Sequence, residues 1–109
     1  LTDVKSNMEV AKEEVFGPVA PVIVANDEKE AVEIANSSEY GLGASIWTKD
    51  ENRALKIARK IEAGCIFINS VVKSDPRMPF GGIKKSGYGR ELSTYGLKEF
   101  VNIKNVSFE

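Results

Sequence analysis

The most constraining feature of this 109-residue sequence is a strand–helix–strand pattern between residues 44 and 69. Two short apolar runs, residues 44–48 and 65–69, flank a segment with apolar side chains at helical spacing. These side chains are Ala54, Ile57, Ala58 and Ile61. A helix between two strands forms a right-handed crossover and makes the strands parallel. The pattern predicts an α/β fold in which residues 65–69 form a fully buried strand.

A similar unit precedes this one. Residues 19–25 are β-branched and apolar, with Pro21 suiting an edge position. Asp27 and Glu30 have capping-box spacing, and the helix that they start should end near Ser38. Together the two units predict a parallel βαβαβ arrangement, whose ligands gather beyond the carboxyl ends of the strands.

The ends of the second helix have their own signals. Either Thr48 with Glu51 or Asp50 alone can cap its amino end. Gly64 stands where a C′ glycine would terminate it. We therefore expect the helix to fill the interval between the two apolar strands.

The carboxyl-terminal part has a weaker pattern. A short helix is expected from about residue 91 to residue 100. Residues 101–108 then alternate apolar with polar side chains, less regularly toward the end, as in a half-exposed strand. Such a strand would have an open edge available for pairing.

Residues 80–91 form a glycine-rich basic loop that fits no standard phosphate-binding motif. Gly82 and Gly87 have P-loop spacing, but Tyr88 occupies the position of the required lysine. Leu92 occupies the third glycine position of the dinucleotide fingerprint. The basic side chains of this loop are therefore interpreted as surface charge, without a cofactor role.

Two segments carry a family resemblance. Residues 14–18 match Glu-x-Phe-Gly-Pro, and residues 79–91 match Pro-Phe-Gly-Gly-x-Lys-x-Ser-Gly-x-Gly-Arg-Glu. Residues 40–44 and 63–69 add two further matches in the same order. In order and spacing the chain resembles the C-terminal part of an NAD(P)-dependent aldehyde dehydrogenase. Residues 74–77, Ser-Asp-Pro-Arg, resemble the bacterial succinate-semialdehyde dehydrogenase branch.

The resemblance implies an organisation in two parts. Residues 1–100 would be the C-terminal part of the catalytic domain, with the βαβαβ arrangement described above. Residues 101–109 would be an oligomerisation-arm strand that extends the sheet of a neighbouring subunit in a homo-oligomer. The first residue is not Met, and the chain begins as though cut from a longer one.

The resemblance also implies a cofactor, NAD or NADP. Glu14 would accept hydrogen bonds from the nicotinamide ribose, because a carboxylate has two acceptor oxygens for two adjacent hydroxyls. Phe16 would lie near the nicotinamide. An ordinary surface glutamate and a core phenylalanine are the alternatives.

Two further residues would contact a small aldehyde. Phe80 would form an aromatic wall of the entry channel and exclude water. Ser74 would contact the distal carboxylate of succinate semialdehyde, although a complete carboxylate site also needs a cation. Lys73 and Arg77 are close in sequence, but the family usually supplies its arginine from upstream. A solvated loop is the alternative for Ser74.

No catalytic residue is assigned within the chain. The family oxidises an aldehyde to a carboxylic acid through a cysteine thiohemiacetal and thioester. Cys65 begins an apolar strand, no histidine is present to activate it, and buried free cysteines are mostly inert. The resemblance places the nucleophile and the glutamate base upstream of Leu1, so the chain alone is predicted to be inactive.

Composition excludes several partners. The formal charge of −1 argues against nucleic acid or an anionic membrane, and no apolar run is long enough to span a bilayer. The single cysteine suits a reducing, cytoplasmic location, and no metal site is expected. A non-catalytic module for strand-mediated assembly is the alternative function.

Overall fold

The computed structural model describes residues 1–109. The chain divides into two compact units, Leu1–Ser38 and Glu39–Glu109, and each is described by itself. None of the helices is both long and apolar enough to cross a membrane.

The first unit contains helices α1, Glu9–Lys12, and α2, Glu28–Asn36. The Asp27 carboxylate caps α2 by accepting a hydrogen bond of 2.8 Å from the Glu30 backbone N–H. The expected capping box differs in one detail, because Glu30 accepts from the backbone N–H of Asn26 (2.7 Å) and not from that of Asp27. The predicted first helix and its cap are confirmed.

The predicted strand over residues 19–25 is not formed in this chain. Only Leu1 makes ladder-like contacts there: its amino group donates to the Ala20 carbonyl and its carbonyl accepts from the Val22 N–H, both at 2.8 Å. Pro21 has no N–H to donate, and no strand of the first unit lies alongside to pair with this segment. The segment therefore remains an extended loop.

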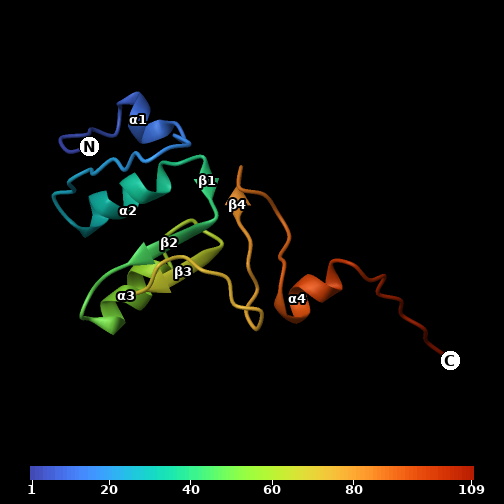
Figure 1. Ribbon diagram of the computed structural model, residues 1–109. Helices are drawn as coiled ribbons and strands as arrows, with labels where there is room; N and C mark the ends of the chain where they lie inside the picture. The colour runs from blue at the N-terminus through green and yellow to red at the C-terminus, as the bar shows by residue number, and fades with distance from the viewer. The chain divides into compact units, whose positions relative to one another are not determined.

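The second unit is built on one βαβ crossover. Strands β2, Gly43–Ile46, and β3, Cys65–Ile68, pair in parallel, and helix α3, Glu51–Ala58, connects them and packs against β3 (Figure 1). Of the two proposed caps, Asp50 is the one that bonds the helix, accepting from the Arg53 N–H at 2.9 Å. The predicted parallel pair and its helix are confirmed.

Strand β3 of this unit is less buried than predicted. The Ala54 side chain on α3 is fully buried, whereas every residue of β3 is half-buried. The prediction that β3 is buried on both faces is therefore wrong for this chain, because α3 and the following loop are too small to cover both faces of a two-stranded sheet.

Gly64 has a different role from the one predicted. Helix α3 ends at Ala58 with Arg59 as its C-cap, and Gly64 does not have the positive φ of a C′ glycine. A Cβ at Gly64 would lie 1.8 Å from the Gly81 carbonyl oxygen. The glycine is needed for close approach of two backbone segments.

The glycine-rich loop folds back on the sheet. Strands β1, Tyr40–Gly41, and β4, Ile83–Lys84, pair antiparallel, and Phe80 and Glu91 exchange two backbone hydrogen bonds. The last helix, α4, spans Ser93–Lys98. It is shorter than the predicted residues 91–100, and at its amino end Leu92, with a φ of 64°, lies outside helical geometry.

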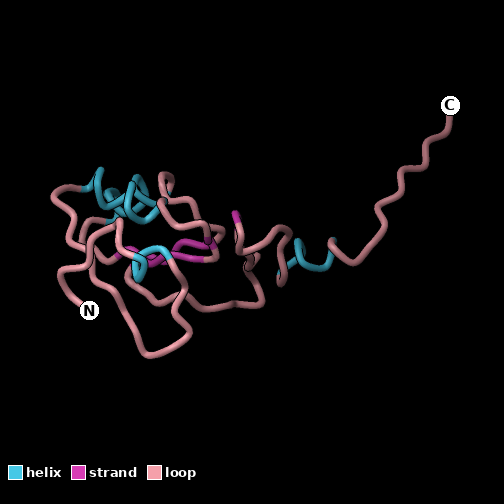
Figure 2. The backbone as a smooth tube through the Cα atoms, turned by 90° about the horizontal axis from the view of Figure 1, so that it is seen from above, coloured by secondary structure: helices cyan, strands magenta, loops and turns pink.

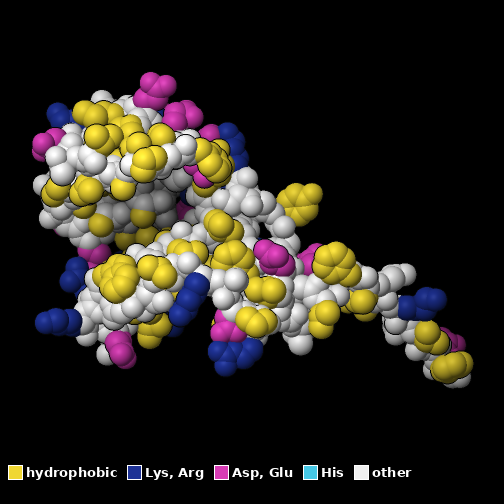
Figure 3. Space-filling view, viewed as in Figure 1, with side chains coloured by type: hydrophobic (Ala, Val, Ile, Leu, Met, Phe, Trp, Pro, Cys, Tyr) yellow, Lys and Arg dark blue, Asp and Glu magenta, His cyan; other side chains and the backbone are white.

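The tail after α4 forms no strand and continues as loop to the C-terminus (Figure 2). Its apolar side chains are exposed and lie along the tail (Figure 3). They are Val101, Ile103, Val106 and Phe108. The predicted strand over residues 101–108 is absent here, since a strand requires a neighbour that the chain does not offer to this segment.

Candidate functional site

The loop that follows β3 encloses a cavity of about 350 Å³. The cavity lies along β3, from Gly64 and Cys65 at the amino end of the strand to Phe67, and beside residues 73–80 of the loop. The apolar wall of this cavity, which we call the β3 pocket, consists of Phe67, Met78, Pro79 and Phe80. Its charged lining residues are Lys73 and Asp75.

Of the two predicted substrate residues, Phe80 lies at this pocket and Ser74 does not. Phe80 lines the β3 pocket, and its role as a substrate wall stays a prediction. Ser74 is exposed and does not line the pocket, although Lys73 and Asp75 on either side of it do. Ser74 therefore lies apart from the pocket lining, between two residues that belong to it.

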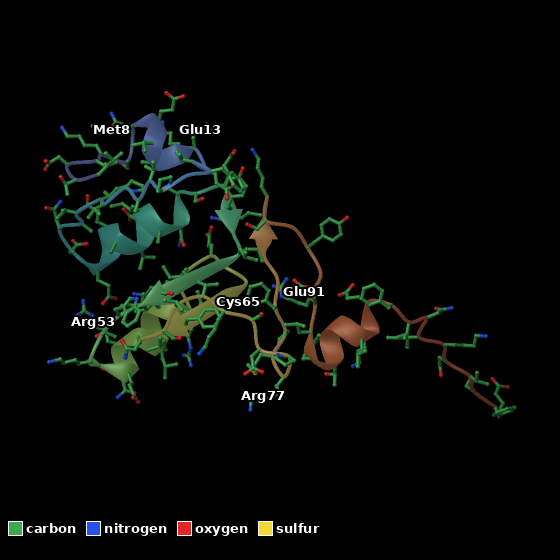
Figure 4. The ribbon with its side chains drawn as sticks, viewed as in Figure 1. Met8, Glu13, Arg53, Cys65, Arg77 and Glu91 are labelled. Atoms are coloured by element: carbon green, nitrogen blue, oxygen red, sulfur yellow. The ribbon has the colours of Figure 1, made fainter.

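Asp75 and Arg77, the latter labelled in Figure 4, form a two-pronged ion pair on the loop. The guanidinium donates from Nε to Oδ1 (3.0 Å) and from Nη2 to Oδ2 (2.6 Å), and the Arg77 backbone N–H donates to Oδ1 (2.9 Å). These hydrogen bonds hold the pKa of Asp75 well below its ordinary value and raise the pKa of Arg77. Asp75 is therefore ionised and Arg77 is occupied by it.

Lys73 has no such partner. Its ammonium makes no hydrogen bond or ion pair, and its charge acts on Asp75 only through space, as the smallest cause of the lowered Asp75 pKa. Sequence reasoning considered Lys73 only as a neighbour of Ser74.

The predicted cofactor residues lie in the first unit. Glu14 is exposed and its carboxylate has no hydrogen bond or ion pair. The Phe16 ring is 95% exposed. A carboxylate with free acceptor oxygens and an exposed aromatic ring are chemically compatible with a nicotinamide nucleoside, and the assignment of both residues stays a prediction.

Cys65 lies at the start of β3, half-buried (Figure 4). Its thiol donates a weak hydrogen bond of 3.6 Å to the Gly81 carbonyl, and its residue lines the β3 pocket. No basic side chain is hydrogen-bonded to the sulfur, so nothing here activates it as a nucleophile. No cluster of three or more His, Cys, Asp or Glu residues could hold a metal ion.

The cations of the glycine-rich loop all have partners within the second unit. Lys84 pairs with Glu62 (2.7 Å), and Lys85 pairs with Glu39 (2.5 Å). The Arg90 guanidinium donates to the carbonyl oxygens of Gly82 and Gly89. These side chains tie the loop to its surroundings, a structural role that the interpretation as surface charge did not include.

Comparison with known protein families shows to which family the chain belongs. Residues 1–106 match the model of the aldehyde dehydrogenase family. The chain belongs to this family. A relative named aldehyde dehydrogenase, from Paenarthrobacter nicotinovorans, is 53% identical over 106 residues, which are 97% of this chain and 23% of the relative. This aldehyde dehydrogenase family chain thus spans about a quarter of the length of that relative.

Two further similarities concern enzymes of succinate semialdehyde. An NADP(+) succinate-semialdehyde dehydrogenase of Mycobacterium ulcerans is 53% identical over 97% of this chain and 23% of its own length. The crystal structure of succinic semialdehyde dehydrogenase from Streptococcus pyogenes with NADP+ superposes with a TM-score of 0.88. It is 46% identical over 93% of this chain and 22% of that chain. The α/β fold deduced from the sequence is therefore the fold of this family.

Proposed function

We propose that this chain contributes the C-terminal part of an NAD(P)-dependent aldehyde dehydrogenase that oxidises succinate semialdehyde. The family match over residues 1–106 carries the proposal, and the names of the M. ulcerans and S. pyogenes proteins support the substrate. When bound, NAD or NADP would accept the hydride of the aldehyde. The reaction would pass through a cysteine thiohemiacetal and thioester, with nucleophile and base supplied by polypeptide outside these 109 residues.

Glu14 and Phe16 would hold the cofactor. The free Glu14 carboxylate would accept hydrogen bonds from the two ribose hydroxyls next to the nicotinamide, and the exposed Phe16 ring would cover the nicotinamide. Bonds of this kind orient the redox ring relative to the aldehyde, which is the main contribution that a binding residue makes to hydride transfer.

Phe80 and Ser74 would act on the aldehyde. Phe80 is part of the apolar wall of the β3 pocket, which would exclude water from the thioester until hydrolysis. Ser74 is exposed and adjacent to the pocket-lining residues, so its hydroxyl would need a change of side-chain direction to reach a substrate carboxylate within the pocket.

Residues 101–109 would pair with a neighbouring subunit in a homo-oligomer. Four apolar side chains of this tail are at least 60% exposed, and the backbone forms no strand within the chain. Addition of this segment to a sheet edge would bury the apolar side chains and satisfy the backbone. Deletion of the tail from the complete protein is expected to lower its oligomeric state, measured by analytical ultracentrifugation.

The cofactor role is tested with adjacent carboxylates in the complete polypeptide that contains this chain. Glu14→Gln should weaken NAD(P)+ binding by about tenfold or more, because hydrogen bonds to a charged acceptor contribute roughly 1.5–3 kcal/mol. Glu13→Gln is the matched control and should leave the dissociation constant unchanged. Equal effects of the two substitutions, measured by calorimetry, would contradict the assignment.

The prediction that this chain lacks the catalytic residues is tested on the chain itself. The purified 109-residue chain should produce no NAD(P)H from succinate semialdehyde above the rate in buffer, since it lacks the nucleophile and the base. The complete polypeptide should produce NAD(P)H under the same conditions. Turnover by the 109-residue chain would show that its catalytic residues are among those described here.

A further inference from the structure

Residues 75–78 form a tight turn in the loop that follows β3. The Met78 N–H donates to the Asp75 carbonyl at 2.9 Å, which closes the turn over four residues. Pro76 is the second of these residues, a position that its fixed φ suits. The Asp75 side chain closes the turn a second time, because its Oδ1 accepts from the Arg77 backbone N–H at 2.9 Å.

The Asp75 carboxylate also holds the Arg77 side chain. The guanidinium donates from Nε to Oδ1 at 3.0 Å and from Nη2 to Oδ2 at 2.6 Å. Bidentate bonds between these two groups fix their relative geometry. Asp75 lines the β3 pocket and is the more covered of the two, with 34% of its side chain exposed against 86% for Arg77.

The turn leads directly into the apolar wall of the β3 pocket. Met78, Pro79 and Phe80 follow one another along the chain, and all three line the pocket. The far end of this segment is held by the backbone, since Phe80 donates to Glu91 at 2.9 Å and accepts from it at 2.8 Å. The φ of Pro79 between the two ends is fixed by its ring. The direction of the segment is therefore set by the turn at one end and by the Phe80–Glu91 pair at the other.

The turn has one further attachment, to the beginning of α4. The Ser93 N–H donates to the Pro76 carbonyl at 3.0 Å. This bond and those between Phe80 and Glu91 use backbone atoms only, so substitution of a side chain leaves the bonding atoms in place. The bonds of the Asp75 carboxylate are made by a side chain, which makes Asp75 the residue at which a substitution loosens the turn.

We propose that Asp75 is a positioning residue for aldehyde binding, which closes the turn and so holds Met78 and Phe80 in place as the apolar wall of the β3 pocket. The proposal rests on the proposed function, in which Phe80 is a wall of the aldehyde site. Asp75 acts through the two wall residues and makes no contact with the substrate. Because an apolar wall contacts the carbon chain, its position affects aldehydes with and without a carboxylate alike.

The test compares Asp75→Ala with Asp75→Asn in the complete polypeptide that contains this chain, with succinate semialdehyde and butanal as substrates. Asp75→Ala removes every side-chain bond of the turn, whereas Asp75→Asn keeps an oxygen that accepts from the Arg77 N–H. Asp75→Ala should lower kcat/KM for both aldehydes by about tenfold, mainly through a higher KM, since small displacements of a positioning group have effects of this size. Asp75→Asn should recover most of the loss.

Glu33→Ala is the matched control. Glu33 also pairs with a cation, Lys29 at 3.7 Å, but it lies on α2 in the first unit and does not line the β3 pocket. Its substitution should leave KM unchanged for both aldehydes. The KM is the decisive quantity, because a variant that is merely destabilised loses kcat through a smaller active fraction and keeps its KM.

Three results would overturn the role of Asp75 while aldehyde oxidation stands. They are an unchanged KM in Asp75→Ala, a loss confined to succinate semialdehyde, and an Asp75→Asn protein as impaired as Asp75→Ala. If the unsubstituted polypeptide oxidises neither aldehyde, the proposed function fails, and the Asp75 proposal fails with it.

Discussion

Gly64 is the position at which a single added methyl group should have the largest effect on this fold. The Cβ of an alanine there would lie 1.8 Å from the Gly81 carbonyl oxygen, 2.8 Å from the Gly81 carbonyl carbon and 3.0 Å from the Gly82 Cα. All three atoms belong to the backbone, so no change of rotamer can relieve the overlap. An ordinary contact would require the two segments to separate by roughly 1.5 Å.

The separation would break two hydrogen bonds that anchor the beginning of β3. The Gly64 N–H donates to the Gly41 carbonyl (2.9 Å) and the Cys65 N–H donates to the Leu42 carbonyl (3.1 Å). Overpacking of this kind costs about 1–3 kcal/mol, and a backbone clash belongs at the upper end of that range. We therefore expect Gly64→Ala to lower the local stability of this region by about 3 kcal/mol.

Hydrogen exchange measured by mass spectrometry on the complete polypeptide can test this value locally. Amides in residues 64–68 should exchange about 100-fold faster in Gly64→Ala, since each 1.4 kcal/mol of lost local stability corresponds to about tenfold. Gly17→Ala is the control, because its added methyl group would meet no atom within 4 Å and its φ is not positive. Unchanged exchange in residues 64–68 of Gly64→Ala would refute the close-approach role of Gly64.

Two other predictions concern Asn69, which lies between β3 and the loop that follows, and Asp75, which lies within that loop. Asn69 has a φ of 52°, and its side-chain amide accepts from the Thr48 N–H and donates to the Thr48 carbonyl, both at 2.9 Å. Asn69→Ala should destabilise the protein by about 2 kcal/mol in chemical denaturation, and Asn69→Gly by less, since glycine adopts the positive φ without strain. Asp75 has a depressed pKa in the folded chain, so its contribution to stability is present above the ordinary carboxyl pKa of 3.8 and is lost as the pH falls through the lower folded value. Arg77→Met should raise the Asp75 pKa toward 3.8 in an NMR titration, and an unchanged pKa would exclude Arg77 as its cause.

The local elements were the most predictable part of the fold. The caps of α2 and α3 are single aspartates three residues before the backbone N–H that they bind, which is a signal contained in a few residues. The parallel pair β2–β3 followed from two apolar runs joined by an amphipathic helix. Residues 19–25 and 101–108 also had strand-like patterns, but their state depends on a partner strand that no local pattern reveals.

The candidate site was only partly predictable. Phe80 was identified from its motif, and the structure places it on the wall of the β3 pocket. Ser74 stays a predicted substrate residue; it is exposed and lies outside the lining of the pocket, which includes its neighbours Lys73 and Asp75. Which residues of this loop line the pocket depends on how the loop lies against β3, and only the folded chain shows that.

The sequence by itself determined the family, the two capped helices and the parallel pair, because each depends on a motif or on interactions between residues near one another in the chain. The tertiary structure decided that Gly64 serves a backbone contact with Gly81 and not a helix end, and that Lys73 and Asp75 line the β3 pocket while Ser74 does not. The physical reason is the number of residues that separate the interacting groups along the chain. A hydrogen-bonded cap closes over three residues, whereas a backbone contact across 17 positions or a pocket wall exists only after the chain has folded back on itself.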